Sequence, residues 1–412
     1  MDLDDRPAVL GGTPVTVTER WPRWPQWDHH ERDELVAALD EGGWWTGDGV
    51  RAQTFADRFA VFHGARFGLP FTNGTHTLEG ALVACDVGEG DEVLVPGLTF
   101  VASATAVLAV NAVPVLVDID AATLNIDVSA AAAAIGPRTK AIVAVHVAGA
   151  ACDIDALLAL CERHDLHLIE DCAHAHGTLW RGRGVGSWGS FGSFSMQRSK
   201  LMTAGEGGVL VCNDDDLRAR AWSYWNCGRV EGEHWYHHAS AGSNMRMTEW
   251  QGAVLLAQLD RFLLQAERRD ANARLLAAAL ERVPGLQAQA RDPRMERQGY
   301  YCFVFHYDAA EFAGLPLRGF ERAVAAEGIP LGVSYPALNT LEVFRTNRFG
   351  PRLRHLDRDY SRVSLPAAEH AARSTVWMEH RVLLAEPDDV LLVAQACERV
   401  HRHASAIAAS DH

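Results

Sequence analysis

Two residues with the potential for chemistry, an acid at Asp171 and an amine at Lys200, follow short apolar runs in the middle of the chain. The run that ends at Asp171 predicts a parallel strand, which would place the carboxylate at the carboxyl end of a sheet, where ligands bind in open α/β folds. Lys200 comes after another such run and before a glycine-rich turn. In a partly desolvated pocket its ammonium form is disfavoured, so the amine can act as a nucleophile near neutral pH.

The pair of an acid and a reactive amine indicates pyridoxal phosphate (PLP) chemistry. A carboxylate against a pyridine nitrogen keeps that nitrogen protonated and makes the ring an electron sink. Lys200 would then hold the cofactor as a Schiff base and move a proton between the substrate Cα and C4′ of the cofactor. Each residue alone has a simpler explanation, because such an aspartate commonly caps a turn and such a lysine is commonly solvated. The prediction therefore depends on both residues together with partners elsewhere.

Those partners would hold a phosphate and a flat ring. Gly74 and Thr75 lie in a turn that opens a predicted helix, so backbone N–H groups, a hydroxyl and the helix dipole favour an anion at one point. Ser195 could add a second hydroxyl. Phe100 follows a predicted strand that ends at the same sheet edge as Asp171, and its ring could stack on a cofactor, although a lone phenylalanine more commonly lies in a core.

The elements that would position these residues alternate between short apolar runs and helix-length segments. The predicted strands are 92–96, 114–118, 141–146 and 166–170. The intervening helical segments include 101–110, 128–135 and 153–164. This alternation predicts an α/β fold with a mostly parallel central sheet and helices on both faces. Two further runs, 192–196 and 207–212, are close enough in sequence to form an antiparallel or edge element.

The chain has 412 residues, which is more than a single core usually accommodates. Residues 1–30 are rich in proline and tryptophan and predict either an arm that lies over the surface or over a partner subunit, or an ordered N-terminal coil. We expect a large domain at 31–260 and a smaller α+β domain at 261–412. Further helices are predicted at 28–41, about 50–63 and 251–282, and further strands near 300–307 and 330–334.

The overall composition is that of a soluble globular protein, with 48% hydrophobic and 22% charged residues. The net charge of −15 and the absence of a basic cluster argue against nucleic acid as a partner. No apolar stretch reaches the roughly 18 residues that span a bilayer, and the acidic start does not look like a signal peptide, so we expect a cytoplasmic protein without membrane contact.

Metal chemistry is not expected. The eight scattered cysteines lack the spacing of a zinc site and predict reduced, mostly buried thiols. His174 and His176 could suggest a metal, but the two cannot hold one ion without a third ligand, and the sequence offers none nearby.

Taken together, these motifs resemble the DegT/DnrJ/EryC1/StrS aminotransferases, PLP enzymes of the aspartate aminotransferase fold (fold type I) that act on keto-sugars and keto-cyclitols. The resemblance extends over nearly the whole chain. The segments that carry it are 42–45, 73–76, 170–177, 194–197, Lys200, 205–208 and 242–249.

The resemblance assigns a role to each matching position. It implies that Lys200 is the Schiff-base lysine and that Asp171 is the partner of the pyridine nitrogen. His174 would lie near the 3-oxygen of the ring and join these two as a catalytic residue. The remaining cofactor-binding residues would be Gly74, Thr75 and Ser195 at the phosphate, Phe100 on the ring, Gln197, and Asn244. Asn244 would reach the phosphate from the neighbouring subunit, which implies a homodimer with shared active sites.

Within the family, the motifs resemble the branch of the scyllo-inosose aminotransferases and 3-amino-5-hydroxybenzoate synthases. We therefore expect a ping-pong transfer of an amino group from L-glutamine or L-glutamate to a keto-cyclitol or keto-sugar in secondary-metabolite, antibiotic-type biosynthesis. Arg246 or Arg229 could pair with the donor carboxylate, although a structural ion pair is the simpler role for either. Two alternatives are a PLP-dependent aromatising dehydratase, as in the aminohydroxybenzoate synthases, and a non-catalytic regulator with the same fold.

Overall fold

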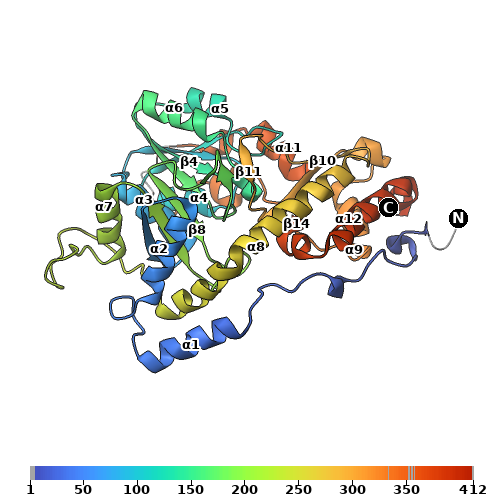
Figure 1. The fold of residues 1–412 in the computed structure, drawn as a ribbon. Coiled ribbons are helices and arrows are strands. Elements are labelled where there is room, and N and C mark those ends of the chain that lie inside the picture. Colours follow the sequence, from blue (N-terminus) through green and yellow to red (C-terminus); the bar gives the residue numbers. More distant parts are fainter. Residues whose placement is uncertain (1–4, 333, 351–352, 354–355, 357, 411–412) are drawn as a thin grey trace.

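The computed structural model describes the chain except for both ends and a few positions in one C-terminal loop. The described residues are 5–332, 334–350, 353, 356 and 358–410. Two sheets, each with its own helices, lie at either end of one long helix, α8 (Glu249–Leu280) (Figure 1).

The larger sheet has seven strands in the order β1-β9-β8-β5-β4-β2-β3. Their bounds are β1 Phe67–Phe71, β2 Glu92–Pro96, β3 Val113–Val117, β4 Thr139–Val145, β5 His167–Asp171, β8 Phe191–Ser195 and β9 Gly208–Cys212. All neighbouring pairs are parallel except those that involve β9, which runs antiparallel to both β1 and β8. The mostly parallel sheet predicted from the sequence is thus confirmed, and so is the antiparallel pairing of the two later runs.

The edge position considered for that pair is wrong, because β1 extends the sheet beyond β9. β1 contains Gly68 and Pro70 within five residues, a composition that normally argues against a strand. At the edge of a sheet a proline is tolerated, because its missing N–H is not needed on the open side.

Helices cover both faces of this sheet, as predicted. Along β2 the side chains alternate: Val93 and Val95 pack in the core that contains α3 and α4, whereas Leu94 packs in the core that contains α5 and α6. The helix bounds are α1 His29–Glu41, α2 Arg51–His63, α3 Gly74–Ala84, α4 Ala102–Ala109, α5 Val128–Ala134, α6 Ile154–His164 and α7 Asp215–Trp225.

The smaller sheet has four antiparallel strands in the order β10-β12-β14-β13. Their bounds are β10 Leu286–Ala288, β12 Cys302–Tyr307, β13 Leu331–Gly332 and β14 Thr375–Glu379. The remaining helices on this side are α9 Leu317–Ala326, α10 Glu342–Arg345, α11 Pro366–Ser374, α12 Pro387–Arg402 and α13 Ala404–Ser410. A three-stranded sheet of β11 Met295–Arg297, β6 Leu179–Trp180 and β7 Arg183–Gly184 lies between the two parts of the chain.

Helix α8 belongs to two cores at once. Phe262 packs with the helices of the large sheet, whereas Leu276 and Leu280 pack with the small sheet. A domain boundary between residues 260 and 261, as proposed from the sequence, therefore lies inside one continuous helix.

The described part of the N-terminal arm lies against its own chain. It forms two short 3-10 turns, η2 Ala8–Leu10 and η3 Thr18–Arg20. Trp21 is buried and its indole N–H donates to the Gly328 carbonyl at 2.7 Å. The Glu327 carboxylate accepts from the backbone N–H groups of Ala8 and Val15 at 2.8 and 2.9 Å. These contacts hold the N-terminal arm against the turn that follows α9, more than 300 residues later in the chain.

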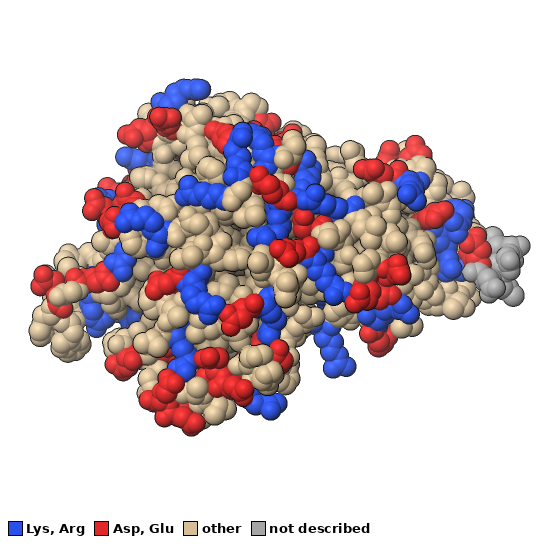
Figure 2. All heavy atoms as spheres, viewed as in Figure 1, with Lys and Arg blue, Asp and Glu red and all other residues tan. Residues whose placement is uncertain are grey.

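The sequence also predicted features of the surface charge, of membrane contact and of the cysteines. On the face shown in Figure 2, cationic and anionic side chains are interspersed rather than separated into patches. Within the described residues no helix has the length and apolarity needed to cross a bilayer. All eight cysteines are free thiols, and six of them are buried, as predicted.

Candidate active site

A cavity of about 560 Å³ lies at the carboxyl ends of the parallel strands. Val145, Asp171 and Ser195, the last residues of β4, β5 and β8, all line it. The start of α3, the segment after β2 and two tyrosines from the small-sheet side complete the wall. This is the place where open α/β sheets bind ligands.

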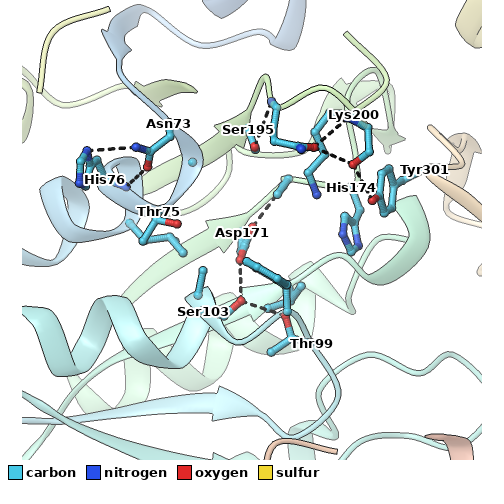
Figure 3. Close-up of a pocket in the computed structure, with 18 of the residues that line it drawn as sticks. Asn73, Thr75, His76, Thr99, Ser103, Asp171, His174, Ser195, Lys200 and Tyr301 are labelled. Atoms are coloured by element: carbon cyan, nitrogen blue, oxygen red, sulfur yellow. Dashed lines mark hydrogen bonds between the residues drawn. The ribbon is translucent and has the colours of Figure 1, made fainter. Parts of the chain in front are cut away.

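Asp171 is buried at the floor of this cavity and held by two donors (Figure 3). Its Oδ2 accepts from the Ser103 hydroxyl at 2.8 Å, and its Oδ1 accepts from the Ala173 N–H at 3.1 Å. The Ser103 hydroxyl is in turn 2.9 Å from the Thr99 hydroxyl. Burial raises the pKa of Asp171 above its ordinary value, while the Ser103 hydrogen bond acts in the opposite direction.

Lys200 projects into the same cavity and is 9% exposed. Its Nζ lies 4.3 Å from the centroid of the Tyr301 ring. Burial lowers the pKa of Lys200 to about 8, although the nearby Asp171 carboxylate opposes that shift. The amine is therefore in the desolvated setting that the sequence pattern predicted.

His174 forms an aromatic wall with two tyrosines. Its ring stacks on Tyr301 with 4.2 Å between centroids and 12° between planes, and its Nε2 is 3.2 Å from the Tyr335 hydroxyl. Burial holds the pKa of His174 well below its ordinary value, so the ring is neutral. Because Nδ1 accepts from the Ala148 N–H at 3.4 Å, the proton is assigned to Nε2, which donates to Tyr335.

The start of α3 provides the anion-binding end of the cavity. Asn73 caps the helix, and its side-chain oxygen accepts from the His76 N–H at 2.9 Å. Gly74 and Thr75 are the first helical residues, so their N–H groups have no partner within the helix. A Cβ at Gly74 would lie 2.6 Å from the Ser195 Cβ, which explains why a glycine stands where the helix meets β8.

Two more residues predicted from the sequence also reach the cavity. Phe100 lines it and is 53% exposed, with its ring centroid 6.1 Å from that of Tyr335. Gln197 lines it as well, and its side-chain oxygen accepts from the Ser199 N–H and hydroxyl, both at 2.8 Å. Gln197 thus orders the turn that leads into Lys200.

Three other candidates lie outside the cavity of their own chain. Asn244 is exposed in the loop before α8 and pairs with Asn226 through a β-bridge. Arg246 donates to the Asn226 side chain at 2.8 Å, and Arg229 donates to the Trp235 carbonyl at 2.8 Å. Within the described residues neither arginine lines this cavity.

Sequence reasoning did not single out Thr99, Ser103, Tyr301 or Tyr335. Ser103 lies in α4, and Thr99 lies before that helix, four residues earlier in the chain, a spacing that is common in sequences. The tyrosines come from segments more than 100 residues after Asp171, and only the docking of the two parts of the chain brings them to it. No local pattern in the sequence marks these four residues.

This architecture defines a class. A buried lysine and a buried aspartate at the carboxyl edge of a seven-stranded, mostly parallel sheet, with a smaller sheet beyond a long helix, are the features of a PLP-dependent transferase of the aspartate aminotransferase fold. More specifically, the chain belongs to the DegT/DnrJ/EryC1/StrS aminotransferase family, whose sequence model matches residues 26–396. It is a PLP-dependent aminotransferase.

Relatives with assigned names are similar over nearly the full length. The chain is 42% identical to the L-glutamine:scyllo-inosose aminotransferase of Streptomyces griseus, over 97% of this chain and 98% of that one. It is 40% identical to the 3-amino-5-hydroxybenzoate synthase of Amycolatopsis mediterranei (strain S699), over 89% and 93%. A crystal structure of 3-amino-5-hydroxybenzoic acid synthase superposes with a TM-score of 0.84 at 38% identity, covering 92% of this chain and 98% of that one.

The groups present in the cavity fit pyridoxal phosphate. A buried amine of lowered pKa and a buried carboxylate face one space, which suits an aldehyde and a pyridine nitrogen. The Ser195 side chain lies directly beside Gly74, the first residue of α3, so a hydroxyl lies next to the N–H groups of the helix start, which suits a phosphate.

Proposed function

We propose that this enzyme transfers an amino group from L-glutamine or L-glutamate to a keto-cyclitol or keto-sugar in secondary-metabolite biosynthesis. The observation that carries the proposal is the joint presence of Lys200 and Asp171, both buried, in one cavity. The names of the relatives favour a cyclitol ketone as acceptor and L-glutamine as donor.

Lys200 is proposed as the residue that holds the cofactor covalently and carries the proton. When bound, pyridoxal phosphate supplies an electron sink for the electron pair that remains at the substrate Cα after its proton leaves. In its neutral form the Lys200 Nζ takes that proton from the donor amino acid. In the second half of the reaction the same nitrogen delivers a proton to the acceptor carbon.

Asp171 is proposed to keep the pyridine nitrogen of the cofactor protonated. The Ser103 hydroxyl would orient the Asp171 carboxylate toward that nitrogen. A carboxylate with two donors retains its ionised form better than an isolated buried one. His174, which is neutral and stacked on Tyr301, would offer a hydrogen-bonding ring edge beside the cofactor without adding charge.

The remaining residues are proposed to position the cofactor. The N–H groups and hydroxyl at Gly74 and Thr75, together with the Ser195 hydroxyl, would bind the phosphate. Phe100 would stack on the ring, and Gln197 would hold the turn before Lys200 in place.

We also propose a cytoplasmic homodimer in which each site is completed by the partner. Neither Asn244, which is exposed, nor the half-buried Arg246 lines the cavity of its own chain, which supports a contribution of this segment to the site of a second copy. The exposed aromatic side chains nearby, Trp44, Trp45, Trp235 and Tyr236, would be covered by such a partner.

Product analysis by mass tests the proposal. Purified enzyme with PLP is incubated with L-glutamine and then with scyllo-inosose. We expect the oxo acid of the donor in the first step and an amine in place of the ketone in the second. An aromatic ultraviolet chromophore formed from an aminoshikimate-type ketone would instead favour the aromatising alternative, for which the 40% identical synthase is the motivating relative. Absence of the oxo acid with every amino acid would contradict the transamination, and absence of the chromophore as well would contradict the aromatising alternative.

A further inference from the structure

A second cavity, of about 570 Å³, adjoins the first one. Ser199, Tyr301 and Tyr335 line both cavities, so the two have these three residues in common. Ser199 immediately precedes Lys200, and its carbonyl accepts from the His380 Nε2 at 3.2 Å. The second cavity is therefore directly beside the residue that carries the chemistry.

Its lining is cationic. Arg23 and Arg198 line the cavity and are exposed to solvent, and neither has an acidic partner within the described part of the chain. Arg381 also lines it but is paired with Glu379, with 2.5 Å between Nε and Oε2. Glu379 is the single carboxylate among the described lining residues, so two positive charges remain uncompensated.

A buried charge in contact with Trp24, one of the residues that line the second cavity, adds to this excess. Arg269 of α8 is completely buried, and all three of its guanidinium nitrogens are without a hydrogen-bond partner among the described residues. Burial lowers its pKa to about 9. Trp24 lies over it, with 5.4 Å from the Arg269 Cζ to the ring. Because a buried guanidinium without a counter-charge is costly, this region is electrostatically incomplete without an anion.

Trp24 and His380 connect this charge to the cavity. Both residues line it, and their rings meet edge to face with 4.5 Å between centroids. The His380 Nδ1 is also buried without a partner among the described residues. Trp24 comes from the N-terminal arm and is fixed by its indole N–H, which donates to the Arg198 carbonyl at 3.0 Å. The arm thus builds one side of the cavity and brings Arg23 to it.

We propose that this second cavity is a substrate subsite for an acidic group, a carboxylate or a phosphate, on a molecule whose reacting carbon lies at Lys200. The inference rests on the proposed transamination and names the substrate feature that the enzyme recognises. Guanidinium groups bind both oxyanions through charge-assisted hydrogen bonds. Two sources supply this chemistry: the carboxylate of the amino donor, or an acidic group on the acceptor.

Direct binding is measured with inorganic phosphate and the PLP-loaded enzyme at constant ionic strength. Trp24 and Trp377 line the cavity, so tryptophan fluorescence reports its occupation. We expect saturable binding that weakens about fivefold or more in Arg23→Gln and in Arg198→Gln, since each removes a charge-assisted contact. Arg282→Gln, an exposed arginine outside both cavities, is the control and should bind as wild type. Equal affinity in all four proteins, or no saturable response, overturns the proposal.

The two half-reactions separate the two sources. Single-turnover reactions of the same variants are followed with L-glutamine, and then with a neutral and with a carboxylate-bearing ketone. A higher half-saturating L-glutamine concentration in Arg198→Gln assigns the subsite to the donor. A rise confined to the acidic ketone assigns it to the acceptor. If both half-reactions of the variants match wild type, the subsite is excluded while the transamination stands; if wild type itself shows no half-reaction, the proposed function fails instead.

Discussion

At Lys200, burial and the charge of Asp171 act on the amine in opposite directions, and burial has the larger effect. The resulting pKa of about 8 leaves an appreciable neutral fraction at physiological pH. Asp171 is subject to the same desolvation, and two hydrogen bonds oppose it. The chemistry of the site therefore depends on a few donors placed around buried ionisable groups.

The capture of PLP by the apo-protein should follow the titration of Lys200. The neutral amine is the reacting form, and its pKa is lowered to about 8, so the capture rate should rise with pH through about 8 and then level off. Stopped-flow absorbance after mixing with PLP measures this rate. A rate that keeps rising toward the ordinary lysine pKa of roughly 10.4 would show that the amine is not desolvated.

Ser103 should matter through Asp171. In Ser103→Ala the carboxylate loses one of its two donors, a charge-assisted bond worth about 1.5–3 kcal/mol, so the single-turnover rate with L-glutamine should fall about tenfold or more. Ser103→Thr retains the hydroxyl and should recover most of the rate. Equal rates in wild type and in the alanine variant would show that the 2.8 Å contact has no role in catalysis.

Among the elements, those with strong periodicity or clear caps were predictable from the sequence. Helix α8 begins after Thr248, whose capping box with Gln251 is visible in the sequence, and β5 was recognised by its apolar run. Strand β1 was missed because Gly68 and Pro70 hide it, and only pairing with β9 holds it in place. The same limit applies to the site: Asp171 follows from its strand end, whereas Tyr335 depends on the packing of a distant segment.

The close contact between Gly74 at the start of α3 and Ser195 at the end of β8 can be tested by substitution. A Cβ in Gly74→Ala would come within 2.6 Å of the Ser195 Cβ and force the helix start away from the strand. We expect the affinity for PLP to fall about tenfold or more, because the phosphate-binding N–H groups move with the helix. Titration of the apo-protein by fluorescence measures this.

Gly88→Ala is the matched control, since a Cβ there meets no atom within 4 Å. Its affinity for PLP should equal that of wild type. Were both variants to bind PLP as wild type does, the start of α3 would not be the phosphate site.

For the molecule as a whole, the long helix α8 couples the two cores, and the N-terminal arm packs against the core of the small sheet. The chain carries a net charge of −15, yet the second cavity beside Lys200 is lined by two arginines, Arg23 and Arg198, that have no acidic partner among the described residues. A local positive potential within an acidic protein is the arrangement expected when a site selects an anionic group. In the proposed dimer, each active site would contain residues from both chains.

Mixing two inactive variants tests the shared site. Lys200→Ala chains and Asn244→Ala chains are each expected to be impaired, but a mixed dimer has one site in which both residues are wild type. After random reassociation, about a quarter of wild-type activity should return. Lys200→Ala mixed with Asp171→Ala is the control, because both residues belong to the same chain's cavity and no intact site forms. Equal recovery in the two mixtures, or none in either, would contradict the contribution of Asn244.

The most direct test of the central assignment is the visible absorbance spectrum of the purified protein with PLP, recorded before and after L-glutamine is added. The account predicts a band of the lysine-bound cofactor in wild type that L-glutamine shifts, and the loss of that lysine-bound band in Lys200→Ala while the fold is retained. A band in Lys200→Ala indistinguishable from that of wild type, or a wild-type band that no amino acid shifts, would contradict it.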